Sequence, residues 1–172
     1  MRLFFALWPD DATRDALAAA AAGLSLRDGR PVARADLHLT LAFLGEVAAE
    51  RLDALYAMAA AIALPAFELE IAMAGWWRRS RVVWLAPREI PTPLVALAGA
   101  LQAGADLHAE SPADYRPHVT IARRVRHVPG LVAGFSIPWQ VQGFALIASN
   151  CAGHGARYRA LAQWPLRGTV SD

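Results

Sequence analysis

Two short segments carry the side chains of this 172-residue chain that are best suited to catalysis. They read His38-Leu39-Thr40-Leu41 and His118-Val119-Thr120-Ile121, and they lie 80 positions apart. Their apolar context is typical of β-strands, on which residues i and i+2 point to the same face. Each segment would therefore present an imidazole and a hydroxyl together. Two such pairs facing each other could supply a general acid, a general base and two hydrogen-bond donors, a set suited to in-line displacement at phosphorus.

Chance does not account well for the two copies. The chain has five histidines and five threonines, for which random placement gives only about 0.15 His-x-Thr pairs. A single copy would be read as a half-buried histidine beside a β-branched residue in a sheet. The matched pair, each copy ending in an aliphatic residue, favours the functional reading.

The remaining pattern predicts an α+β fold. Asp10 or Asp11 can cap the first helix, and Thr92-Pro93 opens the third in the order of a cap followed by proline. Apolar runs and alternation predict strands at 3–8, 37–44, 66–73, 81–86, 118–125, 139–148 and 157–164, the last two joined by a turn at Gly153-Gly155, and helices at 10–22, 48–63 and 92–107.

An offset of 80 residues relates the two halves of this pattern. The order of strand, helix and motif strand occurs once from residue 3 to 44 and again from residue 81 to 125. This architectural repeat predicts that residues 1–172 form a single domain of two lobes related by a pseudo-twofold axis, with the motif strands meeting across a cleft.

Basic charge is supplied by arginine alone and is concentrated late in the chain. There are 17 arginines and no lysine; residues 1–110 hold 10 arginines and 13 acids, whereas residues 111–172 hold 7 arginines and 2 acids. Any phosphate contact must then use a planar guanidinium. The excess suits a modest anionic ligand such as RNA and is too weak for a dedicated duplex binder.

Two arginines compete for the phosphate beside the second motif. Arg124 has the parity that points to the same face as His118, whereas Arg123 lies at an odd offset. Arg123 can reach the site only if a bulge or the strand end turns it inward.

Several other classes of protein are disfavoured. Cys151 is the single cysteine, so no internal disulfide can form, and no Cys/His cluster has the spacing of a zinc site. We therefore expect no metal and no cofactor. No apolar run reaches the roughly 18 residues of a membrane span, and the N-terminus does not resemble a signal peptide. A soluble, cytoplasmic protein is expected.

The segments His38–Gly45 and Pro117–Arg123 resemble the paired signature of the 2H phosphoesterases. Within that superfamily the chain is similar to the bacterial RNA 2′,3′-cyclic phosphodiesterases, long called 2′-5′ RNA ligases. The resemblance extends to Arg2–Ala6 and Arg79–Leu85 and covers nearly the whole chain. It implies a bilobal α+β fold, in which two antiparallel sheets flank a central cleft and the helices lie outside.

The resemblance also implies the reaction. A terminal 2′,3′-cyclic phosphate is hydrolysed to a 2′-phosphomonoester without metal, cofactor or ATP, and ligation would be the reverse reaction. His38 would be the proton donor and His118 the proton acceptor, while Thr40 and Thr120 would hold phosphate oxygens. Arg123 would bind the phosphate, which favours it over Arg124. Leu41 and Ile121 fill the remaining motif positions and are expected to help bind substrate. The partner would be RNA or a nucleotide with that cyclic end, bound by a monomer.

Other interpretations stay open. The chain could be an RNA-binding module of the same fold without turnover, a domain whose cleft serves a protein partner, or a phosphodiesterase for another cyclic phosphate such as that of ADP-ribose. Trp76 and Trp77 could stack on bases, although core packing is the simpler interpretation. Tyr115 and Arg116 could line the mouth of the cleft.

Overall fold

The computed structural model describes residues 1–106, 115–128, 130, 134–149 and 157–167. The helices in these ranges are α1 (Asp11–Gly23), α2 (Leu52–Ala60) and α3 (Thr92–Gly104), with short 3₁₀ turns at Arg34–Asp36 and Ala49–Arg51. The strands are β1 (Arg2–Leu7), β2 (Arg30–Pro31), β3 (Leu39–Glu46), β4 (Phe67–Trp77), β5 (Val82–Pro87), β6 (Val119–Arg123), β7 (Ile137–Val141), β8 (Gly143–Ser149) and β9 (Tyr158–Pro165). The sequence-based prediction of an α+β fold is confirmed.

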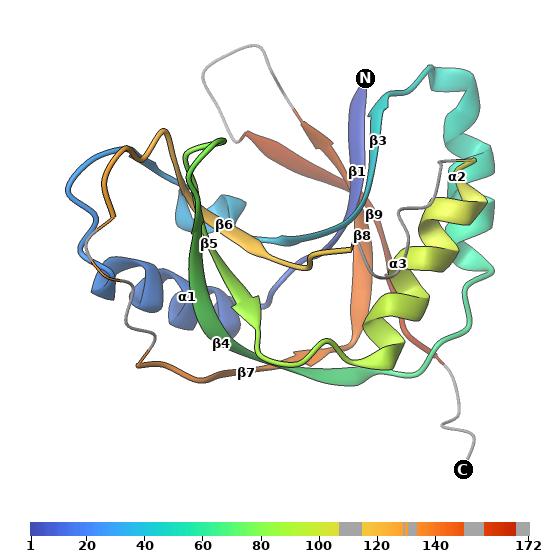
Figure 1. The fold of residues 1–172 in the computed structure, drawn as a ribbon. Coiled ribbons are helices and arrows are strands. Elements are labelled where there is room, and N and C mark those ends of the chain that lie inside the picture. The colour runs from blue at the N-terminus through green and yellow to red at the C-terminus, as the bar shows by residue number, and fades with distance from the viewer. Residues whose placement is uncertain (107–114, 129, 131–133, 150–156, 168–172) are drawn as a thin grey trace.

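The strands form a curled antiparallel sheet with two arms (Figure 1). One arm has the order β7-β4-β5-β6 and the other the order β3-β1-β8-β9, while β2 pairs separately with β6. The arms meet where β3 pairs with β6 at the single register position Leu39↔Val119. The residues just before this position are His38 and His118. The join between the arms therefore brings the two motifs together, and the two expected sheets are continuous through it.

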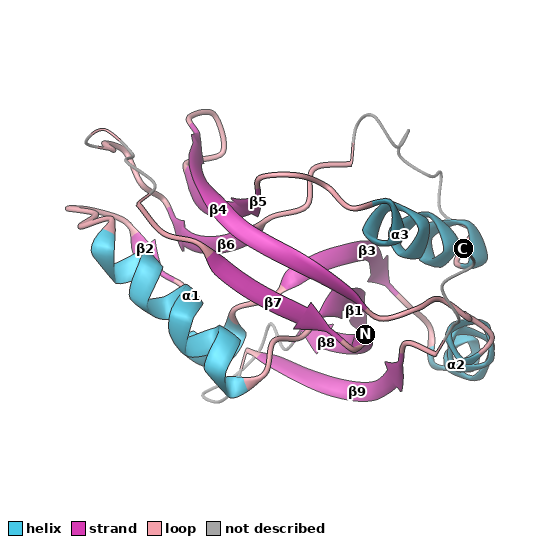
Figure 2. Ribbon diagram, turned by 90° about the horizontal axis from the view of Figure 1, so that it is seen from below, coloured by secondary structure: helices cyan, strands magenta, loops and turns pink. Residues whose placement is uncertain are grey.

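The helices cover the outer side of the arms. Helix α1 lies along β7, whereas α2 and α3 pack together at the other end of the molecule, against β9 and β3 respectively (Figure 2). Helix α1 starts as expected, because the Asp10 carboxylate accepts a hydrogen bond from the Thr13 N–H at 2.8 Å. Leu3, Phe5 and Leu7 of β1 are fully buried in the main core. Burial of a side chain of this size contributes roughly 1.5–3 kcal/mol.

The opposite face of β1 contributes to a second apolar cluster, which consists of Phe4, Ala6, Ala145 and Ile147 with Trp8 and Tyr158 packed against it. This separation follows from the alternation of side chains along a strand. It places aromatic rings on the side of the sheet that carries His38.

Two predictions about elements were wrong in detail. The run 139–148 is two strands, because the chain leaves β4 and joins β1 after Gln142, whose carbonyl accepts a hydrogen bond from the Leu166 N–H at 2.8 Å. Thr92 does not cap α3: it is the first helical residue, and Pro91 precedes it without a side-chain bond. The predicted turn at 153–155 and Cys151 lie outside the described residues.

Candidate active site

A β-bulge follows the threonine in each motif strand. In β3 the register with β1 passes from Thr40 to Ala42 and skips Leu41, and in β6 the register with β5 passes from Thr120 to Ala122 and skips Ile121. An extra residue reverses the alternation of the strand beyond it. Residues at odd offsets from the histidines therefore return to the face of the threonines. The two residues moved in this way are Phe43 and Arg123.

This geometry resolves the choice between the arginines and places the two aliphatic motif residues. Arg123 lines the same cavity as both histidines, whereas Arg124 does not. The side chains of Leu41 and Ile121 are 1% and 2% exposed and belong to the main core. Neither lines the cleft, so a substrate bound there would not touch their side chains. They anchor the bulges by packing inward.

One cavity of about 460 Å³ contains all four motif side chains that could do chemistry. Its lining consists of Arg2, Phe4, His38, Thr40, Phe43, Trp77, Ser80, Val82, His118, Thr120, Arg123, Ser149, Arg157 and Tyr158. Three guanidinium groups and no carboxylate are among these residues. Such a lining favours a small anion, because no negative group opposes it.

His38 is held in an aromatic environment. Its ring centroid lies 4.9 Å from that of Phe4, 5.0 Å from Tyr158 and 5.7 Å from Trp8, which stacks on it. Burial lowers the pKa of His38 from 6.5 to about 4. The hydrogen bond between its Nδ1 and the Asp36 carbonyl, 2.6 Å long, opposes this fall, whereas the positive charge of Arg123 adds to it. The free protein therefore holds a neutral imidazole here at pH 7.

His118 occupies the matching place in the second motif. Its Nδ1 lies 2.8 Å from the carbonyl oxygen of Arg116, again two residues earlier in the chain. Trp77 meets its ring edge-on at 4.5 Å. Burial also lowers the pKa of His118, with a further contribution from Arg123, although the bond to Arg116 opposes the change. In each neutral ring the Nδ1–H donates to the carbonyl, which leaves the lone pair on Nε2.

Tyr115 has a different role from the one expected. It is buried rather than at the mouth of the cleft, and its hydroxyl donates a hydrogen bond to the Thr40 carbonyl at 3.1 Å. The side-chain amide of Gln102 likewise donates to the carbonyl of the bulge residue Leu41 at 3.2 Å. These two bonds tie the first motif strand to distant parts of the chain and hold its irregular backbone in place.

Trp77 lines the cleft, while its neighbour Trp76 packs against the core, so one of the two tryptophans is available at the site. The aromatic contacts of His38 were not anticipated. The alternation in β1 would place Phe4 on the face opposite Leu3 and Phe5, but no local pattern brings Tyr158 to a histidine 120 positions earlier.

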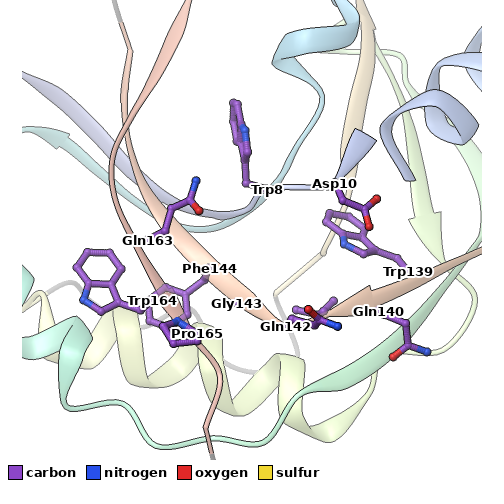
Figure 3. A pocket seen from close by; sticks show the side chains of 11 residues that line it. Trp8, Asp10, Trp139, Gln140, Gln142, Gly143, Phe144, Gln163, Trp164 and Pro165 are labelled. Atoms are coloured by element: carbon purple, nitrogen blue, oxygen red, sulfur yellow. The ribbon is translucent and has the colours of Figure 1, made fainter. Parts of the chain in front are cut away.

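Trp8 also borders a separate cavity of about 390 Å³, which Figure 3 shows from close by. Asp10, Trp139, Gln142, Gln163 and Trp164 are among its lining residues, and neither motif contributes to it. Within the described ranges no group of three or more His, Cys, Asp or Glu side chains could hold a metal ion. No helix in the described part of the chain is long and apolar enough to cross a membrane.

A curled antiparallel sheet with two His-x-Thr pairs in one cleft defines a protein of the 2H phosphoesterase class. The chain belongs to the 2′-5′ RNA ligase superfamily, whose family model matches residues 9–150. The chain is 40% identical to an RNA 2′,3′-cyclic phosphodiesterase of Escherichia coli, over 96% of each protein. It is 34% identical to a protein of the same name from Thermus thermophilus, over 98% of this chain and 91% of the relative.

Solved structures agree with this assignment. The crystal structure of E. coli LigT complexed with 3′-AMP superposes with a TM-score of 0.86 at 39% identity and covers 96% of this chain and 98% of that one. The T. thermophilus protein TT0787 superposes with a TM-score of 0.80 at 31% identity, over 98% and 99% of the two chains. The α+β 2H phosphoesterase fold implied by the motif resemblance is thereby confirmed.

Proposed function

We propose that this chain hydrolyses a 2′,3′-cyclic phosphate at the end of RNA or of a nucleotide and leaves a 2′-phosphomonoester. The observation that carries the proposal is the pair of imidazoles in one arginine-lined cleft, each with its Nδ1 on a backbone carbonyl and with no hydrogen bond to its Nε2 from the described residues. The names of the E. coli and T. thermophilus relatives support the same reaction.

The two histidines divide the proton transfers. Nε2 of His118 accepts a proton from water while the water oxygen forms a bond to phosphorus. The bond from phosphorus to O3′ breaks, and Nε2 of His38 gives its proton to that oxygen. The product carries the phosphate on O2′, and the proton gained by His118 returns to solvent. Each transfer is a general acid or base step of the kind that contributes roughly 10²–10⁴-fold.

Three further side chains stabilise the charge on phosphorus. The hydroxyls of Thr40 and Thr120 share the face of the histidines and donate to the non-bridging oxygens. The guanidinium of Arg123, turned inward by the bulge, binds the same group. Donors fixed in a sheet need little rearrangement as charge develops, which is why they stabilise a transition state.

Protonation of His38 depends on the substrate. In the free protein burial holds the pKa of this group at about 4, so few molecules at pH 7 carry the proton that the leaving oxygen needs. A cyclic phosphate brings a negative charge to the ring and favours the imidazolium. His38 therefore becomes protonated, and able to act as the acid, when the substrate binds.

Ligation would reverse the same steps, with a 5′-hydroxyl in place of water. That the chain works as a cytoplasmic monomer, and that residues 1–172 form one domain of two related lobes, stay predictions. Sedimentation of the purified protein tests the first of these in part, because it reports the oligomeric state.

Incubation with a nucleoside 2′,3′-cyclic phosphate and EDTA, followed by ³¹P NMR of the product, tests the proposal. Turnover to the 2′-phosphate by the wild type and by H127N, with loss of turnover in H38N and H118N, is expected. His127 is a matched control because its side chain is 88% exposed and lies outside the cleft. A 3′-phosphate product would reverse the assignment of the broken bond. Binding without turnover would indicate an RNA-binding module instead.

A further inference from the structure

A second cavity of about 380 Å³ adjoins the catalytic cleft. The two share His38, Thr120, Arg123, Arg157 and Tyr158 as a common wall. The residues found only in the second cavity are Arg30, Pro31, Val32, Ala33, Asp36 and Arg124. We call this space the arginine pocket. Its lining has four guanidinium groups against the single carboxylate of Asp36, so it carries a net positive charge.

The backbone places Arg30 and Arg124 beside the catalytic cleft at a cost to the stability of the fold. Arg30 in β2 pairs with Arg123 in β6, so two like charges lie on adjacent strands. Arg124 follows directly and has a φ of 62°, in the left-handed region that disfavours residues with a side chain. The left-handed backbone of Arg124 and the two like charges beside it both reduce stability. Unfavourable features of this kind cluster at ligand sites, so their presence here indicates such a site.

Most of the positive charge of the pocket has no ion-pair partner among the described residues. Asp36 is the one carboxylate of the lining; burial raises its pKa, and the charge of Arg157 acts to lower it. Within the described residues Arg30, Arg124 and Arg157 form no ion pair, whereas Arg34 and Arg51 do. Arg157 lies instead over the ring of Tyr158, 5.7 Å from its centroid. Guanidinium groups without a carboxylate partner remain available for the planar, two-point contact that they make with phosphate.

We propose that the arginine pocket binds a second phosphate of the substrate, the phosphodiester on the 5′ side of the terminal nucleotide. This proposal rests on the function proposed above. If the cyclic phosphate lies between the two histidines, the next phosphate is one nucleotide away, and the arginine pocket is the adjoining cationic space. The enzyme would then prefer an RNA end to a mononucleotide. Arg30 and Arg124 are specificity residues in this scheme and touch no reacting atom.

The test compares two substrates, a nucleoside 2′,3′-cyclic phosphate and a dinucleotide that ends in the same cyclic phosphate. The wild type should show the higher kcat/KM for the dinucleotide. R30Q and R124Q should each reduce that preference by about 5–10-fold, as expected for one charged hydrogen bond in a partly exposed pocket. Arg88 is exposed and outside both cavities, so R88Q should retain the wild-type preference.

Salt and product binding give independent readouts. The slope of log kcat/KM against log salt should be steeper for the dinucleotide, by about 0.7 for one more phosphate contact on a single strand, and R30Q/R124Q should remove the difference. By calorimetry, a nucleoside 2′,5′-bisphosphate should bind the wild type more tightly than the 2′-phosphate, and the double variant should bind the two alike.

The outcomes separate the two proposals. Equal kcat/KM for both substrates in the wild type, or equal losses on both in R30Q and R124Q, would overturn the second phosphate site and leave the hydrolase intact. A wild type that turns over neither substrate would refute the hydrolase and the phosphate site together. Circular dichroism of each variant shows whether a loss of the preference for the dinucleotide comes from misfolding. If R124Q is misfolded, calorimetry with the same two ligands on R124N tests the second phosphate site instead, because asparagine tolerates the left-handed conformation.

Discussion

An anion in the cleft is expected to drive a proton onto His38, and the size of the effect follows from its surroundings. The fall of the His38 pKa from 6.5 to about 4 corresponds to a preference of roughly 3 kcal/mol for the neutral ring. One negative charge about 4 Å from the imidazolium contributes about 4 kcal/mol at an effective dielectric constant of about 20. The two effects nearly cancel. The pKa of His38 in the complex should therefore return close to its ordinary value.

Inorganic sulfate is a suitable probe because it is tetrahedral and does not titrate near neutral pH. Calorimetric titrations at pH 5.5, in two buffers of different ionisation enthalpy, report the protons taken up on binding. We expect the wild type to take up about one proton per sulfate. NMR titration of the imidazole signals, assigned with H38N and H118N, should show His38 still neutral at pH 5.5 in the free protein and charged with sulfate bound.

The variants locate the proton. H38N should take up clearly less than the wild type, whereas H118N should retain most of the uptake. Because His38 and His118 interact and titrate as a pair, the quantity to compare with the prediction is the total number of protons that both take up. A His38 signal that titrates near pH 6.5 in the free protein would contradict the reasoning, because the aromatic contacts would then not be desolvating the ring. Sulfate binding without proton uptake would contradict it as well.

Four further outcomes are expected. T40V and T120V should each lower kcat by roughly 10²-fold and leave the fold intact, since each removes one donor to a charged oxygen; a drop below tenfold in kinetic assays would argue against that role. Because the pKa of His38 in the free enzyme is about 4, the fraction of His38 that carries a proton, and with it kcat/KM, should fall about tenfold per pH unit from pH 6.5 to 8.5, and a flat profile over that range would contradict this. The unfolded chain binds a proton at the ordinary pKa of histidine, 6.5, and the native state only near pH 4, so the free energy of unfolding should fall as pH drops from 6.5 towards 4. Urea titrations should show the wild type losing up to about 3 kcal/mol relative to H38N across that range, and parallel curves would count against it. Y115F should lower the free energy of unfolding by about 1 kcal/mol, because the Thr40 carbonyl loses its partner; an unchanged urea midpoint would show that the bond is replaced.

Much of the fold could be predicted because its signals are local. The run 3–8 reads as a strand, and Asp10 or Asp11 as a helix cap, from their own residue types and spacing; the structure has the strand at Arg2–Leu7 and shows that Asp10 is the cap. The split of 139–148 at Gln142 could not be predicted, because both parts have strand character. What divides them is the change of pairing partner from β4 to β1, which depends on segments far away in sequence.

The amino-acid sequence by itself determined which groups could do the chemistry: two imidazoles and two hydroxyls at strand spacing, and arginine as the sole basic residue. Side-chain identity and the period of a strand are local properties, so one chain suffices to read them. Only the tertiary structure decided that Arg123 turns into the cleft whereas Leu41 and Ile121 pack into the core, because the direction of a side chain after a bulge depends on the register with the neighbouring strand. It also decided the state of His38, since desolvation by Tyr158 and Trp8 arises only when the distant strands pack.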